Sequence, residues 1–298
     1  MKISEKYILN LILSILLVFS LLGTVSMSFV KNHLLNETTY IENYERNNIS
    51  QKAYDEINTY FTNSTDYSRI PADVYMSAIS EEDIKTIINL KIQWLFDYIS
   101  VGNTKTAVVK ADYKYDYSAL ERSITDYFDK FASENNVAVD DSYNAQLQNT
   151  IDTAVSEIEN YTDIYLIDLI EKTGILSKVR KYYDLVDVLM YICIAVTVLC
   201  IVLISVLSRK RIANILYWLS LSGICMSIIT LIPTLWLKLS GITNKLIIRN
   251  KCVYAAYTGL LSDSINSLLT TVMIILGISA AILIIAIIIS KFTNKKKA

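Results

Sequence analysis

Residues 188–237 read VLMYICIAVTVLCIVLISVLSRKRIANILYWLSLSGICMSIITLIPTLWL. Two uncharged runs, 188–208 and 212–237, are separated only by the basic triplet RKR at 209–211. Because an α-helix rises about 1.5 Å per residue, about 20 apolar residues cross the hydrocarbon core of a bilayer, which is roughly 30 Å thick. Both runs are long enough. The stretch therefore predicts two membrane-spanning helices joined by a short basic turn.

Two further runs, 7–30 and 266–290, also contain no Asp, Glu, Lys, Arg or His. The sequence thus predicts an all-α membrane protein with four transmembrane helices. The first run follows Lys2 and Lys6, as the apolar core of a secretory signal peptide would. That core is usually about 7 to 15 residues long, which is shorter than this run. We therefore expect a retained anchor, with a cleaved signal peptide as the alternative.

Basic residues in short loops predict how the chain is threaded, because such residues are enriched on the cytoplasmic side of a membrane. The segments 1–6, 209–211 and 291–298 together hold nine Lys and Arg and one acid, whereas 238–265 holds four and one. This bias predicts that both termini are cytoplasmic and that the long segment 31–187 lies outside. The residues expected to set this topology include Arg209, Lys210, Arg211, Lys295, Lys296 and Lys297.

The predicted outer domain, 31–187, is strongly acidic, with 15 Lys and Arg against 27 Asp and Glu. Such a surface repels nucleic acid, so we expect no nucleic-acid partner. The outer loop 238–265 instead has a net charge of +3. Two interpretations remain open for it. The loop docks beneath the acidic domain, or, as we favour, it lies as an interfacial helix whose cations meet lipid headgroups.

Cysteine usage and overall composition indicate a source. None of the four cysteines lies in 31–187, so packing alone must hold that domain together. Cys252, in the outer loop, is expected to be an exposed, unpaired thiol. Few Gly and Pro, together with abundant Ile, Asn, Lys and Tyr, are typical of an AT-rich genome. We therefore expect a multi-pass protein in the cell membrane of a Gram-positive type of bacterium.

Apolar residues within 31–187 recur at helical spacing. Helices are predicted after an N-terminal cap at Ser50, after a capping box formed by Ser80 and Asp83, from Ser118, and from Ser142 to Lys172. Four amphipathic faces of this kind can close a helical bundle.

One stretch, 104–117, breaks the helical spacing. Its β-branched and aromatic residues alternate with polar ones, which predicts a short extended strand. Tyr113, Tyr115 and Tyr117 would then share one face. Tyrosine supplies contact area at a low entropy cost, so this face is a candidate partner surface. The simpler interpretation is that the three tyrosines cover the bundle.

The residue types needed for catalysis are scarce. His33 is the only histidine, and the few glycines form neither of the common phosphate-binding motifs. A nucleophile with a histidine base, or a zinc site of His and Cys, is therefore not expected. The sequence predicts a protein that is not an enzyme and has no catalytic residue, metal or cofactor.

The predicted cytoplasmic segments are too short for a catalytic domain. We expect the outer domain to bind, sense or scaffold a membrane or cell-surface partner, with the lipid bilayer around the spans. In layout alone, with no shared motif, the chain resembles the permeases of cell-division and macrolide-export ABC systems. That resemblance implies a transport or mechanotransmission subunit as the alternative. The chain departs from those permeases because 209–211 leaves almost no room for the cytoplasmic segment that engages their ATPase.

Overall fold

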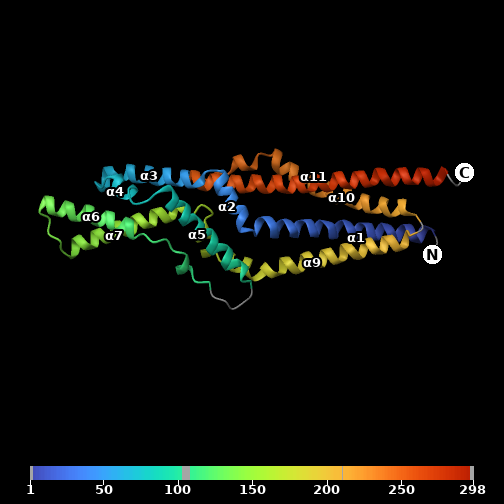
Figure 1. Ribbon diagram of the computed structural model, residues 1–298, viewed down its shortest axis with the longest axis horizontal. Coiled ribbons are helices and arrows are strands. Elements are labelled where there is room, and N and C mark those ends of the chain that lie inside the picture. Colours follow the sequence, from blue (N-terminus) through green and yellow to red (C-terminus); the bar gives the residue numbers. More distant parts are fainter. Residues whose placement is uncertain (1–2, 103–107, 210, 296–298) are drawn as a thin grey trace. The chain divides into compact units, whose positions relative to one another are not determined.

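The computed structural model describes residues 3–102, 108–209 and 211–295. Over these ranges the chain forms helices, turns and loops, and no strand. Four helices are long and apolar enough to cross a membrane (Figure 1). They are α1 (Ile3–Phe29), α9 (Ile175–Leu207), α10 (Ile212–Leu239) and α11 (Lys251–Lys295), and α1 continues into a π-helical turn over Val30–Leu34. The prediction of an all-helical chain with four such helices is confirmed.

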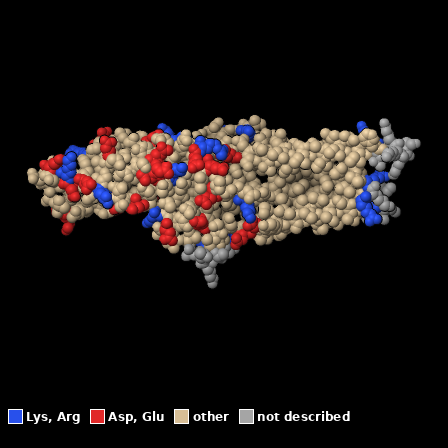
Figure 2. All heavy atoms as spheres, viewed as in Figure 1, with Lys and Arg blue, Asp and Glu red and all other residues tan. Residues whose placement is uncertain are grey.

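The chain divides into two units, which we name by their composition. The apolar unit comprises residues 1–36, 182–245 and 261–298, and the acidic unit comprises 37–181 and 246–260. By sequence the acidic unit contains 25 Asp and Glu against 16 Lys and Arg. Charged side chains are spread over its surface, whereas the charged side chains of the apolar unit lie near the ends of its helices (Figure 2).

Shorter helices build the acidic unit. They are α2 (Glu37–Arg46), α3 (Ile49–Ser68), α4 (Ala72–Met76), α5 (Glu81–Ser100), α6 (Ser118–Asn135), α7 (Asp141–Thr162) and α8 (Ile167–Lys172). Helices α3, α5 and α7 pack on one another through fully buried isoleucines such as Ile57, Ile88 and Ile158. Burying one such side chain contributes roughly 1.5 to 3 kcal/mol. Packing alone thus provides a core for the unit.

The helix starts were predicted with mixed success. The capping box is confirmed, since Ser80 and Asp83 exchange both of its hydrogen bonds. The cap at Ser50 is wrong, because α3 already begins at Ile49 and the Ser50 hydroxyl donates to Glu81 instead.

The single helix predicted from Ser142 to Lys172 is wrong, because it is two helices. Helix α7 ends at Thr162, and Leu166, just before α8, adopts a left-handed conformation with φ of 51°. The Asp163 carboxylate accepts hydrogen bonds from the backbone of Ile167 and Asp168, at 2.6 and 3.1 Å. These two bonds satisfy backbone N–H groups in the first turn of α8 and offset the helical bonds lost at the break.

The strand expected at 104–117 is also wrong in the part that the structure describes, since 104–107 lie outside it. Residues Lys110–Tyr113 form a 3-10 turn, and 114–117 are irregular. A strand needs a partner for its backbone hydrogen bonds, and the described residues offer no second strand. The side chains of this segment bond to helices instead.

The loop between α10 and α11 differs from the interpretation that we favoured. After a 3-10 turn at Ile242–Lys245, residues 246–260 belong to the acidic unit, and α11 begins at Lys251 without a separate interfacial helix. Glu56 of α3 accepts hydrogen bonds from the backbone of Lys251 and Cys252, at 2.9 and 3.3 Å. Docking onto the acidic domain, the interpretation that we had left open, is therefore the better description of this segment.

A second contact, in the junction between the start of α11 and the other helices of the acidic unit, involves α2. The side-chain amide of Asn43, in α2, donates to the backbone carbonyl of Ala256 and to the Tyr165 hydroxyl, both at 2.9 Å. Gly259 fits against Asn43 so closely that a Cβ atom there would lie 2.3 Å from the amide oxygen. Cys252 is fully buried in this junction, which corrects the expectation of an exposed thiol.

The apolar unit is held by close helix contacts and a few polar bridges. Leu17 of α1, Cys200 and Ile204 of α9 and Trp218 of α10 form a buried cluster. The hydroxyls of Ser14 and Ser222 lie 2.7 Å apart and hydrogen-bond across α1 and α10. Small residues and hydroxyls of this kind are typical of contacts between membrane helices.

Candidate ligand-binding cavity

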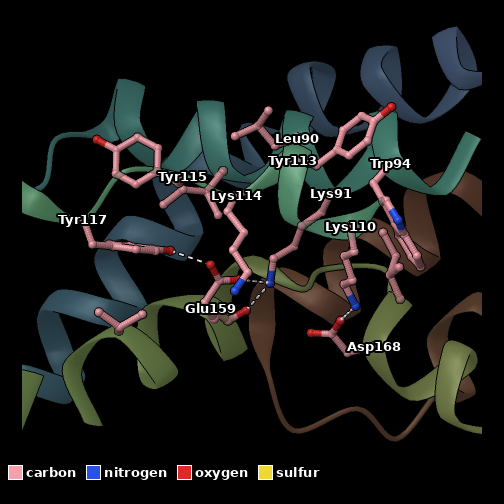
Figure 3. Close-up of a pocket in the computed structure, with 13 residues that line it drawn as sticks. Leu90, Lys91, Trp94, Lys110, Tyr113, Lys114, Tyr115, Tyr117, Glu159 and Asp168 are labelled. Atoms are coloured by element: carbon pink, nitrogen blue, oxygen red, sulfur yellow. Dashed lines mark hydrogen bonds and ion pairs between the residues drawn. The ribbon is translucent and has the colours of Figure 1, made fainter. Parts of the chain in front are cut away.

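A cavity of about 280 Å³ lies within the acidic unit. Helix α5 forms one wall, helices α7 and α8 form another, and the segment 110–117 lies across it (Figure 3). The lining is apolar with a few charged groups: Ile87, Leu90, Lys91, Trp94, Lys110, Tyr113, Lys114, Tyr115, Tyr117, Val155, Glu159, Ile167 and Asp168. Apolar walls with a small number of oriented polar groups are typical of ligand sites.

One end of the cavity is organised around Glu159 (Figure 3). The Lys91 ammonium donates to the backbone carbonyl of Glu159 and pairs with its carboxylate, each at 2.6 Å. The Tyr117 hydroxyl donates to the same carboxylate at 2.8 Å. Burial, and then the neighbouring negative charge of Glu159, raise the pKa of Tyr117 far above its usual value. The hydroxyl therefore remains a donor throughout the physiological pH range.

The other end combines an aromatic ring with a paired cation. The Lys110 ammonium lies 4.6 Å from the centre of the Trp94 ring, within the range of a cation–π contact. It also donates to Asp168 and Glu171, at 2.6 Å each. Burial lowers the pKa of Lys110, but the two carboxylate partners raise it more, so the net pKa lies above the ordinary value.

Two hydrogen-bond donors of the lining have no partner among the residues that the structure describes. The first is the indole N–H of Trp94, which is buried, with the side chain only 3% exposed. The second is the ammonium group of Lys114, an exposed residue whose side chain points toward Glu159 (Figure 3). Leaving a buried donor without a partner costs about 1 to 3 kcal/mol. A ligand that carries an acceptor would remove this cost.

The structure places all three tyrosines singled out in the sequence at the cavity. Each hydroxyl donates to a carboxylate of the unit: Tyr113 to Asp97 and Tyr115 to Asp83, both at 2.7 Å, and Tyr117 to Glu159. All three are partly buried and line the cavity. Their hydrogen bonds attach the segment to the helices. A role in contacting a partner directly stays a prediction.

The predicted topology residues fall at the ends of helices. Arg209 follows α9, and Arg211 is the residue before α10. Lys295 is the last residue of α11, and Lys210, Lys296 and Lys297 lie outside the described residues.

Sequence reasoning missed the rest of the lining. Trp94 is the only tryptophan between the first two apolar runs, and Lys91 interrupts the run of apolar residues on α5. Both were visible signals. Glu159, the partner of Lys91, is 68 residues away along the chain, and Asp168, the partner of Lys110, is 58 residues away. No local pattern connects residues that far apart.

The chain matches no protein-family model, and comparisons with curated proteins and with solved structures found no similar protein.

Proposed function

We propose that this chain is a non-enzymatic multi-pass membrane protein whose acidic unit lies outside the membrane and binds a ligand or partner there. Its location would be the cell membrane of a Gram-positive type of bacterium, with both termini in the cytoplasm. The four apolar helices support the membrane location. The distribution of basic residues supports the orientation.

The observation that carries the binding proposal is the buried, unpartnered indole N–H of Trp94, a residue that lines the cavity. Buried polar groups in folded proteins almost always have a partner. Lys91 and Lys110 are already neutralised by carboxylates, so the indole N–H and Lys114 remain as donors for a ligand. The ligand that fits has an apolar body and a carboxylate, either as a free molecule or as an acidic side chain of a partner protein.

A set of matched probes tests this proposal on the full chain in detergent. The protein is labelled with ¹⁵N-tryptophan, and the Trp94 indole signal is identified by its loss in Trp94→Phe. We expect 3-phenylpropionate to shift this signal. Its amide should shift the signal less, and 3-phenylpropylamine should leave it unchanged. Equal responses to all three probes, or none to the carboxylate, would contradict the proposal.

A matched pair of variants shows whether the effect is local. Lys114→Gln removes the free ammonium at the cavity and should weaken binding of the carboxylate probe by about threefold to tenfold, since one exposed charge contributes roughly 1 kcal/mol. Lys130→Gln removes an exposed ammonium on α6, away from the lining residues, and should leave binding unchanged.

The permease-like alternative stays a prediction that no contact in the structure favours. Helix α9 ends at Leu207 and α10 begins at Ile212, so the link between them is short. Co-purification of an ATPase that depends on this link would support that alternative.

A further inference from the structure

A second cavity, of about 460 Å³, lies in the apolar unit where α1 begins and where α9 gives way to α10. Its lining includes Lys6, Tyr7 and Asn10 of α1, Arg209 and Arg211 between α9 and α10, and Trp218 of α10. The proposed function does not use this cavity.

The cavity is basic. Lys6, Arg209 and Arg211 line it, and no Asp or Glu does. Within the part of the chain that the structure describes, none of these three cations has an ion-pair partner. Three unneutralised cations around one hollow repel one another, and an anion would relieve that repulsion. Arginine in particular matches the geometry of phosphate oxygens.

A buried amide gives a second, independent indication of a ligand. Asn10 lines the cavity and is only 6% exposed. Its nitrogen donates to the Ser208 hydroxyl at 3.2 Å, and its oxygen is buried without a partner among the described residues. A buried amide oxygen of this kind indicates that a hydrogen-bond donor belongs beside it.

The surroundings of the cavity match the level of lipid headgroups. The rings of Tyr7 and Trp218 meet edge to face, with 5.3 Å between their centres. Tyrosine and tryptophan are enriched where a membrane meets water. Large apolar side chains such as Ile8, Ile12 and Val206 are exposed along the helices that leave the cavity. An acyl chain can therefore lie on the helices while its headgroup occupies the hollow.

We infer that this cavity binds the headgroup of an anionic phospholipid that carries a hydroxyl, as phosphatidylglycerol does. The phosphodiester contacts Lys6, Arg209 and Arg211, and a headgroup hydroxyl donates to the Asn10 oxygen. Zwitterionic headgroups bind more weakly because they bring no net negative charge. The basic residues at this end then serve as a lipid site in addition to any part in topology.

The test uses native mass spectrometry of the full chain released from nanodiscs, which counts the lipids that stay bound. We compare phosphatidylcholine alone with mixtures that contain phosphatidylglycerol or phosphatidylmethanol, which have the same charge but differ in the headgroup hydroxyls. We expect retention to be strongest for phosphatidylglycerol. It should be intermediate for phosphatidylmethanol and weakest for phosphatidylcholine. Equal retention of all three would overturn the inference.

Variants separate the contributions of charge and hydroxyl. Arg211→Gln should reduce retention of phosphatidylglycerol about fivefold, the effect of roughly one basic residue near an anionic lipid. Lys291→Gln removes a cation from α11 that does not line the cavity, and it should have no effect. Asn10→Leu should abolish the preference for phosphatidylglycerol over phosphatidylmethanol. If Arg211→Gln and Lys291→Gln behave alike, the cavity is not the site.

Two controls exclude binding of soluble phosphates and unfolding of the variants. Inorganic phosphate and glycerol 1-phosphate, added at millimolar concentration, should not displace the lipid. Full displacement would reassign the cavity to soluble phosphates and overturn the lipid inference. Each variant's thermal unfolding in detergent is measured in parallel. Should Arg211→Gln fail to fold, Arg209→Gln takes its place with the same expected loss.

Discussion

Tyr113, Tyr115 and Tyr117 show what a residue pattern predicts and what it does not. They alternate with Lys114 and Asp116, which are more exposed, although Lys114 also lines the cavity. This alternation suggested a strand, which the described residues of this stretch, 108–117, do not form. The carboxylates that hold the hydroxyls lie 16, 32 and 42 residues away along the chain, so no local spacing predicts them.

Alkaline titration tests the attachment of this segment. Burial, and then the hydrogen bond to Asp83, raise the pKa of Tyr115 to about 12. Because its pKa is higher in the folded chain, the neutral hydroxyl stabilises the fold fully below its ordinary pKa near 10. That contribution is lost as the pH rises through the folded value.

The measurement is the absorbance of ionised tyrosine in wild type and in Tyr115→Phe. We expect the difference between the two curves to show one step near pH 12. A step near pH 10 would mean that Tyr115 is neither buried nor bonded to Asp83.

Helix α11 shows that hydropathy alone does not predict where a helix begins. The apolar run 266–290 predicted a span but not the position where its helix begins. Helix α11 starts at Lys251, because Glu56 and Asn250 accept hydrogen bonds from its first backbone N–H groups. Glu56 lies in a different segment of the chain, so only the folded unit brings this cap to the helix.

The reactivity of Cys252 reports on this cap. Glu56→Ala removes the carboxylate, and losing a helix cap costs about 1 kcal/mol. Local opening should then be more frequent, and a water-soluble maleimide should label Cys252 about fivefold faster. Glu121→Ala, an exposed acid on α6, serves as the matched control and should leave the rate unchanged. Equal rates in the two variants would show that Glu56 does not hold the junction.

Two glycines test how closely the long apolar helices pack. A Cβ atom at Gly223, in α10, would lie 2.2 Å from the Ser279 hydroxyl oxygen of α11, whereas one at Gly277 would meet nothing within 4 Å. Gly223→Val should therefore lower the free energy of unfolding by about 1 to 3 kcal/mol, as overpacking does. Gly277→Val should cost far less. Thermal unfolding in detergent compares the two, and equal losses would contradict this packing.

For the whole molecule, composition predicted the division into an apolar part and an acidic part. The runs without charge became the long helices, and the amphipathic segments became the small ones. What composition did not predict is that 246–260 joins the acidic unit, since its positive charge also suits lipid headgroups. The contacts of Asn43 and Glu56 decide between these interpretations, and both residues lie some 200 positions away from their partners.

We propose that the acidic unit lies outside the membrane and binds its ligand or partner there. The most direct test is labelling of single cysteines in intact cells with a maleimide that does not cross membranes. Asn135→Cys, at the end of α6, and Lys291→Cys, near the end of α11, are introduced after alanine replaces the four native cysteines. We expect Asn135→Cys to be labelled in intact cells and Lys291→Cys only after lysis. The reverse pattern would place the acidic unit in the cytoplasm and rule out binding outside the membrane.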